Sequence, residues 1–179
     1  MKNEIINALD RSLLRIKGGY SVEREVDFQS VLFGELYKEL PDAIIRFEHT
    51  LKNDYQSYVQ RGRTTKNRKS RVDLHISDAG KTIVIELKYF KGASKEDCAD
   101  MIADLAKVER IVEAGEANEG FCIQLVKEGV INRLPTLVEQ KKYSFEVGRW
   151  NYNFEIKRKY QVASREAPCG RSVIWHHIK

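Results

Sequence analysis

The chain has 179 residues, of which 42% are hydrophobic and 32% are charged. This composition excludes a mostly disordered protein, because it provides apolar surface for a core and charge for a solvated shell. The 31 Lys and Arg residues exceed the 26 Asp and Glu residues and give a net charge of +5, which is a first indication of an anionic partner.

The sequence contains no segment that predicts a membrane span or a secretory signal. Its apolar runs are far shorter than the roughly 20 residues that a membrane helix needs. Glu4 and Asp10 lie in the N-terminal helical pattern, where a signal peptide would have an apolar stretch. Three cysteines without a CxxC spacing, Cys98, Cys122 and Cys169, indicate a reducing compartment. We therefore expect a cytoplasmic protein with no membrane partner.

Apolar residues at helical spacing and runs of strand-forming residues divide the chain into elements. The expected elements, in chain order, are a helix over 3–17, a helix over about 21–40, strands over 43–51, 71–77 and 81–90, a helix from about 94 to 115, a strand over 120–126, a short helix over 135–140, and strands over 143–147, 152–162 and 172–178. Ser21 and Ser94 are the expected N-caps of the second and third helices. The polar, basic stretch 52–70 is expected to be a loop, and loops of that length are usually functional or disordered.

This order of elements predicts an α/β fold with a central mixed β-sheet flanked by helices. We expect one domain over residues 1–179. Its core would span about residues 21–126, preceded by the helix over 3–17 and followed by a β-rich tail over 143–178.

The most informative segment is the hairpin predicted around Ala79 and Gly80. If these two residues form the turn, residues that face each other have numbers that sum to 159, so Asp73 lies opposite Glu86. Glu86 and Lys88 are two apart on one strand and share a face with Asp73. A one-residue bulge would shift the pairing, but Glu86 and Lys88 would still share a face.

Two carboxylates opposite each other repel and destabilise a sheet, so something must offset their charge. Mg²⁺ suits this place because it binds one or two protein carboxylates and completes its shell with waters and phosphate oxygens. A nearby ammonium group can position a water or stabilise charge on a phosphate. Asp73, Glu86 and Lys88 therefore predict a site for metal-dependent phosphodiester hydrolysis. The alternative is a solvated sheet face with an ordinary Glu–Lys ion pair.

These residues resemble the PD-(D/E)XK nuclease superfamily, whose fold is called restriction-endonuclease-like. The similarity consists of Asp73 at the end of RVD on one strand, a short hairpin, the ELK of residues 86–88 on the next strand, and a following helix. It extends loosely over about residues 21–126, and Val72 stands where the motif has proline. The resemblance implies that Asp73 and Glu86 bind Mg²⁺, with Mn²⁺ as an expected substitute. It also implies that Lys88 contacts the attacking water or the scissile phosphate.

Many members of that superfamily also supply a catalytic glutamate from the first core helix. Glu25 lies on the apolar stripe of the second predicted helix and is the first candidate for this role, and Glu35, near the edge of the stripe, is the alternative. Gln29, one turn after Glu25, is placed to reach the same site. Glu48, in the strand before the basic stretch, is either a further ligand or a solvent-facing strand residue.

Other polar residues have simpler interpretations. His75 shares the face of Asp73, and it is either a contact to substrate or metal or, as we interpret it, a satisfied polar residue. Asp100 and Asp104, one turn apart on the following helix, are either groups that support the metal site from behind or, as we interpret them, part of the acidic outer face of that helix. The adjacent histidines 176 and 177 have no carboxylate or cysteine partner at ligand spacing, so no zinc site is expected.

A cluster of cations lies directly before Asp73. Residues 60–71, called the basic segment below, contain no acidic residue and six cations: Arg61, Arg63, Lys66, Arg68, Lys69 and Arg71. Cations that neutralise several phosphates make nucleic-acid binding strongly dependent on salt. We expect the basic segment to bind the DNA backbone at the mouth of the metal site. Tyr55 and Tyr58, just before it, are candidates for stacking on unpaired bases, with packing as the alternative.

Together these features predict a Mg²⁺-dependent deoxyribonuclease. Two alternatives stay open: a catalytically silent nucleic-acid-binding or scaffolding module of the same fold, and a protein–protein adaptor whose basic segment docks an acidic partner. A nuclease that cuts both strands of a duplex needs two active sites, so a homodimer is compatible with this prediction, although the sequence identifies no interface.

Overall fold

The computed structural model describes residues 1–62, 69–127 and 129–179. Two helices come first, followed by strands, a third helix and a C-terminal part made mostly of strands, which is close to the order that the sequence predicts. In chain order they are α1 Lys2–Lys17, α2 Glu25–Glu39, β1 Ile44–Thr50, β2 Tyr58–Gln60, β3 Arg71–Asp78, β4 Lys81–Phe90, α3 Lys95–Glu113, β5 Glu119–Val126, the 3₁₀ turn Ile131–Arg133, β6 Leu137–Val138, β7 Lys141–Val147, β8 Trp150–Ile156, β9 Tyr160–Gln161, β10 Ser164–Glu166 and β11 Ser172–Ile178.

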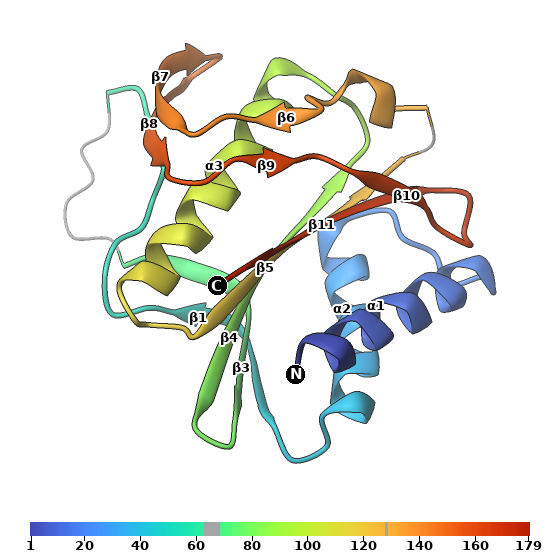
Figure 1. Cartoon of the computed structure of the whole chain (residues 1–179). Helices are drawn as coiled ribbons and strands as arrows, with labels where there is room; N and C mark the ends of the chain where they lie inside the picture. Colours follow the sequence, from blue (N-terminus) through green and yellow to red (C-terminus); the bar gives the residue numbers. More distant parts are fainter. Residues whose placement is uncertain (63–68, 128) are drawn as a thin grey trace.

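A mixed β-sheet forms the centre of the molecule (Figure 1). Within the described residues it has six strands, in the order β1-β3-β4-β5-β11-β10. The β4 and β5 strands run parallel, because α3 returns the chain across the sheet between them, and the other neighbouring pairs are antiparallel. The predicted α/β class, with a central mixed sheet flanked by helices, is confirmed.

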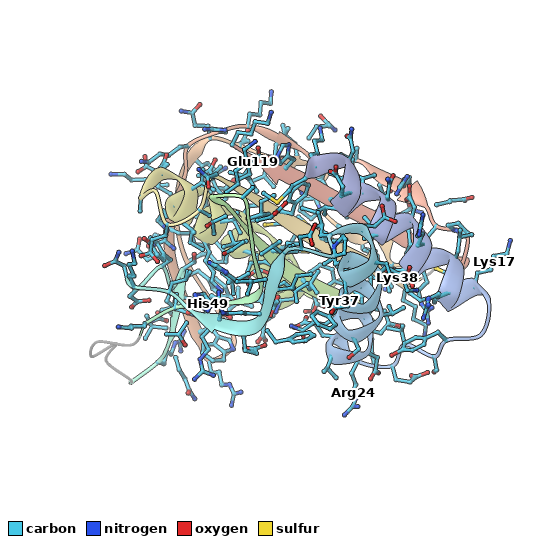
Figure 2. The ribbon with its side chains drawn as sticks, turned by 90° about the horizontal axis from the view of Figure 1, so that it is seen from below. Lys17, Arg24, Tyr37, Lys38, His49 and Glu119 are labelled. Carbon is cyan, nitrogen blue, oxygen red and sulfur yellow. The ribbon has the colours of Figure 1, made fainter. Side chains whose placement is uncertain are left out.

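Helices cover the sheet on both faces. On one face α1 and α2 lie side by side (Figure 2), and their apolar side chains share a core with Leu74, Ile85 and Phe121 of the sheet. On the other face α3 lies between the central sheet and a second sheet of order β2-β8-β7. The β3–β4 hairpin, α3 and β2 therefore meet on the second face. Among the helices of the described residues, none combines the length and apolar character needed to cross a membrane.

The second helix begins later than predicted, at Glu25 instead of near residue 21. The Asp27 carboxylate accepts hydrogen bonds from two backbone N–H groups just before the helix, at 3.0 and 2.8 Å, and this capping sets the first turn. Ser21 is therefore not the N-cap. The third helix begins where predicted, since Ser94 Oγ accepts a hydrogen bond from the N–H of Asp97 at 3.0 Å.

Three later predictions about secondary structure are wrong. Part of the expected loop 52–70 is the strand β2, which pairs with β8. The segment 135–140 contains the strand β6 where a helix was expected, and the strand expected over 152–162 is divided into β8 and β9. The last strand of the expected β-rich tail belongs to the central sheet, where β11 lies between β5 and β10 (dark red in Figure 1).

Candidate active site

The β3–β4 hairpin has the register that the sequence predicts. Ala79 and Gly80 form the turn, both with positive φ, and the pairs run from Asp78 opposite Lys81 to Leu74 opposite Ile85. The backbone pairing between β3 and β4 ends at Leu74, one residue before Asp73. The Asp73 carboxylate instead accepts a hydrogen bond from the backbone N–H of Leu87, at 2.6 Å. This contact fixes the carboxylate against the neighbouring strand.

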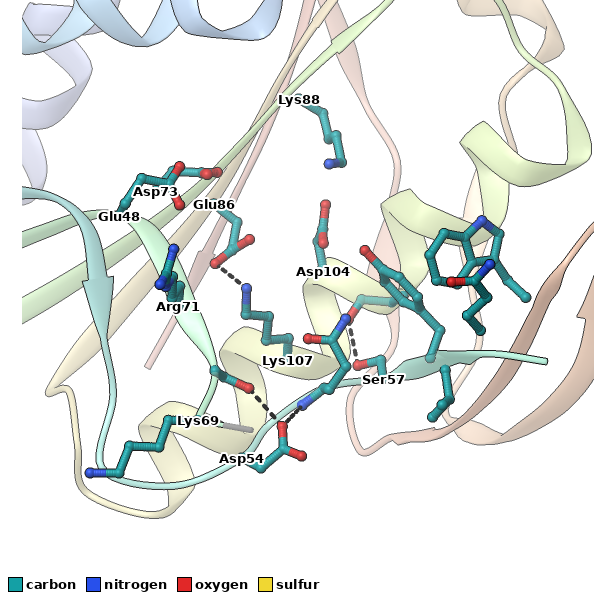
Figure 3. Close-up of a pocket in the computed structure, with 17 residues that line it drawn as sticks. Glu48, Asp54, Ser57, Lys69, Arg71, Asp73, Glu86, Lys88, Asp104 and Lys107 are labelled. Atoms are coloured by element: carbon teal, nitrogen blue, oxygen red, sulfur yellow. Dashed lines mark hydrogen bonds and ion pairs between the residues drawn. The ribbon is translucent and has the colours of Figure 1, made fainter. Parts of the chain in front are cut away.

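A cavity of about 480 Å³ lies between the hairpin, α3 and β2 (Figure 3). Its lining joins three of the four predicted catalytic residues to two cations of the basic segment. The charged residues that line it are Glu48, Asp54, Lys69, Arg71, Asp73, Glu86, Lys88, Asp104 and Lys107. The three hairpin residues Asp73, Glu86 and Lys88, predicted to act together, thus line one cavity.

Glu86 is paired with a lysine that sequence reasoning did not single out. Its Oε1 lies 2.7 Å from Nζ of Lys107 on α3, and the Glu86 residue is only 7% exposed. Figure 3 shows this ion pair at the centre of the cavity. Burial raises the pKa of Glu86, because the charged carboxylate loses its hydration, and the positive charge of Lys107 opposes that rise.

Lys88 lies near the acidic groups of Asp104 and Glu25. The negative charge of Asp104 is the main cause that raises the pKa of Lys88 above its ordinary value, and Glu25 adds to it. The Glu25 Oε2 atom is 3.7 Å from Nζ of Lys88. Asp104 is buried on α3, and its Oδ2 has no hydrogen-bond partner among the described residues. Lys88 therefore carries a positive charge at neutral pH and cannot act as a base there.

Asp73 has a second anchor besides Leu87. Its backbone carbonyl accepts a hydrogen bond from Nε2 of Gln29, at 2.9 Å, so the predicted reach of Gln29 to this region is confirmed. Burial raises the pKa of the Asp73 carboxyl to about 6, the hydrogen bond from Leu87 lowers it, and the charge of Glu25 raises it further. The cavity therefore concentrates carboxylates that are costly to ionise without a cation.

The two helix glutamates have different surroundings. Glu25, at the start of α2, reaches Lys88. Glu35 lies away from the cavity, where it pairs with Arg15 of α1 and with Lys38, the latter at 2.9 Å. The structure thus places Glu25, and not the alternative Glu35, next to the hairpin residues.

Glu48 and His75 also differ in placement. Glu48 is exposed but lines the cavity, so it is both solvent-facing and near Asp73. His75 is buried with its ring 4.1 Å from that of His49, and its Nδ1 has no hydrogen-bond partner within the described residues. The interpretation of His75 as a satisfied polar residue is therefore wrong. It does not line the cavity.

The basic segment is only partly described. Lys69 and Arg71 line the cavity. Arg61 forms an ion pair with Glu146 of β7. Arg63, Lys66 and Arg68, three of the predicted DNA-binding residues, lie outside the described residues.

Lys107 is a functional candidate that sequence reasoning missed, and Asp104 is one that it assigned to the outer face of the helix. Asp104 is only 6% exposed, and Asp100 accepts a hydrogen bond from the buried Tyr152 at 2.7 Å, so the interpretation of these acids as an outer face is wrong. A signal was present in the sequence. Residues 100, 104 and 107 are spaced by one helical turn and flank the apolar stripe through Met101, which places them on the inner side of α3.

The donor set can be compared with the requirements of the expected Mg²⁺. Among the described residues, no group of three or more His, Cys, Asp and Glu side chains forms a metal cluster. A hard cation that keeps waters and phosphate oxygens needs only one or two protein carboxylates. Asp73 and Glu86 meet that requirement, because both line the same cavity. The residues present therefore fit this ion.

Comparisons with known proteins give no family assignment. No protein-family model matches the chain, and no curated protein matches it in sequence. Among solved structures, the crystal structure of SSO0001 is similar to this chain, with 16% sequence identity over 86% of this chain and 67% of that one, and a TM-score of 0.28. A likeness of this degree carries no argument about function.

Proposed function

We propose that the protein is a Mg²⁺-dependent nuclease that hydrolyses DNA phosphodiester bonds, built on a restriction-endonuclease-like core of the PD-(D/E)XK type. One observation carries the proposal: carboxylates and cations line the same cavity. Asp73, Glu86 and Lys88 of the hairpin face it together with Lys69 and Arg71. Carboxylates alone favour a cation and basic side chains alone favour an anion, whereas both together fit a metal ion shared with a phosphate.

Asp73 and Glu86 would hold the ion, and Mn²⁺ is expected to replace Mg²⁺. A bound Mg²⁺ would act as a Lewis acid on phosphate oxygens and lower the pKa of a bound water. The hydrogen bond from Leu87 orients Asp73 before any ion binds. Glu86 must exchange or share its contact with Lys107 to serve as a ligand, because Lys107 Nζ is 2.7 Å away.

The cations of the cavity have separate roles in this proposal. Lys88, as an ammonium group, stabilises the negative charge that develops on the phosphate when water attacks it. Glu25 keeps Lys88 oriented through their contact at 3.7 Å and is thus a positioning residue. Lys107 offers a second ammonium group once Glu86 has bound the metal. Lys69 and Arg71 bind the phosphates that flank the scissile bond. These contacts are electrostatic and do not depend on the base sequence.

The proposal is tested by cleavage of supercoiled plasmid and of a labelled single strand without metal, with Mg²⁺ and with Mn²⁺. Wild type is compared with Asp73→Asn and Lys88→Ala. We expect cutting only with metal, and loss of cutting in both variants. Matched controls come from the same hairpin: Asp78→Asn and Lys81→Ala change the same residue types outside the cavity and are expected to cut normally.

The outcomes separate the proposal from its alternatives. Cutting that survives in both Asp73→Asn and Lys88→Ala would show that the site lies elsewhere. Salt-sensitive DNA binding without any cutting would favour a catalytically silent binding module. Absence of both binding at low salt and metal-dependent thermal stabilisation would favour a protein–protein adaptor.

A further inference from the structure

An aromatic wall of the cavity comes from the second sheet. Tyr58 of β2 and Trp150 of β8 both line the cavity that contains Lys88 and Asp104. Tyr58 pairs with Tyr152 and Gln60 pairs with Trp150, so Tyr58 and Trp150 lie on one face of this sheet. Their rings meet edge to face, with centroids 5.4 Å apart.

Tyr58 and Trp150 differ from the aromatic residue that packs beside them. Tyr152 is 1% exposed, and its hydroxyl group donates to Asp100 at 2.7 Å, as expected for a core residue. Tyr58 and Trp150 are only partly buried and border an open, polar space. The guanidinium of Arg149 lies over the Trp150 ring, 5.3 Å from its centroid, and adds positive charge at this wall. An aromatic surface with a cation beside it is the usual platform for an unpaired base.

The depth of the catalytic groups restricts what can reach them. Glu86 and Asp104 are 7% and 6% exposed, and α3 and β2 form the walls around them. A duplex is a stiff rod with its phosphates on the outside, and bending it over a short length costs several kcal/mol. An unpaired strand bends freely, and a cavity of about 480 Å³ has the size of sites that enclose small molecules. The phosphodiester of an unpaired nucleotide can therefore reach these groups with less deformation than that of a duplex.

We propose that the substrate of this site is single-stranded DNA, with the base beside the scissile phosphate stacked on Trp150 and bordered by Tyr58. The inference rests on the proposed nuclease function for the cleavage step. The base-binding step rests on the aromatic wall alone and is tested separately.

The chain contains two tryptophans, which makes the binding step measurable without catalysis. Trp175 lies on β11, with the ammonium group of Lys2 5.8 Å from its ring centroid, and it does not line the cavity. In Trp175→Phe, fluorescence reports Trp150 alone, and in Trp150→Phe it reports Trp175 alone. Both variants are titrated in EDTA with a thymidine oligonucleotide of about 12 nucleotides and with a duplex of the same length.

We expect the single strand to quench the fluorescence of Trp175→Phe and the duplex to leave it unchanged. Neither is expected to affect Trp150→Phe fluorescence. The dissociation constant for the single strand, measured by anisotropy of a labelled oligonucleotide, is expected to rise roughly 5- to 150-fold in Trp150→Ala, the range for loss of one stacked base. Trp150→Phe, which keeps an aromatic ring, is expected to retain most of the affinity, so the effect is separable from misfolding.

A cleavage assay with Mg²⁺ on the same oligonucleotides distinguishes the two proposals. Equal binding of duplex and single strand, or an unchanged affinity in Trp150→Ala, would overturn the single-strand inference, even if metal-dependent cutting sensitive to Lys88→Ala is found. Quenching of Trp150 by the single strand without cutting of any substrate would overturn the nuclease proposal and leave single-strand binding supported. Absence of binding to either oligonucleotide would overturn the inference as well.

Discussion

The carboxylate of Asp73 accepts a hydrogen bond from the backbone N–H of Leu87 at the point where the backbone pairing between β3 and β4 ends. The β1–β3 pairing is interrupted at the same residue: pairs form on either side of Glu48 and Asp73 but not between these two. Glu48 has a positive φ of 44° at this interruption. Asp73 is therefore a residue of β3 that pairs through its backbone with neither β1 nor β4. A side chain replaces a backbone partner there, and a carboxylate is turned toward the cavity without loss of the strand.

Asp73→Asn is expected to abolish cutting while stabilising the metal-free protein. The pKa of Asp73 is about 6 in the folded state against 3.8 for the free group, so this residue contributes stability below about pH 4 that is lost as the pH rises through 6. Asparagine removes the free-energy cost of ionising a buried carboxyl, and its amide oxygen can still accept the hydrogen bond from Leu87. We expect a gain of roughly 1–3 kcal/mol near pH 8 that disappears near pH 4, measured by urea denaturation in EDTA.

Mg²⁺ provides the complementary measurement for the Asp73 variant. Saturating Mg²⁺ is expected to stabilise the wild type at pH 8 and to leave Asp73→Asn unchanged, since a ligand that binds only the folded state raises its stability. Asp78→Asn is the matched control at the other end of the strand. Equal stabilisation of wild type and Asp73→Asn by Mg²⁺ would contradict the assignment of Asp73 as a ligand.

Lys107→Met is expected to destabilise the protein in a pH-dependent way. Loss of the ion pair raises the folded-state pKa of Glu86 further above its unfolded value near 4.5. Below that value Glu86 is neutral in both states, and as the pH rises the cost of ionising it in the folded protein lowers the free energy of unfolding. The destabilisation should be small near pH 5 and reach about 3–5 kcal/mol near pH 9, the usual cost of an unpaired buried charge. The double variant Lys107→Met/Glu86→Gln is expected to recover most of the loss at pH 9. A loss that is the same at every pH would show that Lys107 acts through packing.

Glu25→Gln and Glu35→Gln are expected to have opposite consequences. Glu25→Gln weakens the contact that orients Lys88 and should lower kcat/KM roughly 10- to 100-fold, as for other groups that position a catalytic residue, with little change in stability. Glu35→Gln removes a buried partner of Arg15 and Lys38 and should cost about 1–3 kcal/mol without slowing cutting of the folded enzyme. Steady-state kinetics and thermal melting of both variants check this pair. A catalytic defect only in Glu35→Gln would reverse the assignment.

A pair of glycine substitutions tests how tightly α3 is held. An added Cβ at Gly120 of β5 would lie 2.2 Å from Cγ1 of Val108, so Gly120→Ala must displace α3 and should cost roughly 1–3 kcal/mol. Cutting should also fall, because α3 carries Asp104 and Lys107. At Gly34 of α2 nothing lies within 4 Å of an added Cβ, so Gly34→Ala should stabilise by roughly 0.5–1 kcal/mol. Normal stability of Gly120→Ala would contradict the close packing of α3 on β5.

The hairpin was predictable because the residues that determine its register lie close together in the sequence. A two-residue turn and the alternation of apolar and polar residues are sufficient to determine which side chains share a face, and the observed register from Asp78 to Leu74 agrees. The N-cap at Ser94 is local in the same sense, since its partner Asp97 is three residues away. The true start of α2 was missed because the polar run before it offers several caps, and the Asp27 carboxylate outcompetes Ser21.

The other half of the cavity was not predictable from nearby residues. The spacing of Asp104 and Lys107 beside the apolar stripe indicates the inner side of α3, but only the packing of α3 on β4 and β5 shows that they face the hairpin residues. The strand β2 is three residues long and exists because β8 pairs with it from a distant part of the chain. Short strands of this kind depend on tertiary contacts, because their intrinsic preference is weak.

The position of β11 has a consequence for synthesis of the protein on the ribosome. β5 is almost fully apolar, and one of its edges is paired only when β11 arrives. About 50 residues separate Val126 from Ile178, so at about 5–20 residues per second this edge stays open for roughly 3–10 s. An open apolar edge can pair with another nascent chain. Slow translation after residue 126 should therefore lower the yield of monomeric protein, and chaperones that cover exposed strands should restore it.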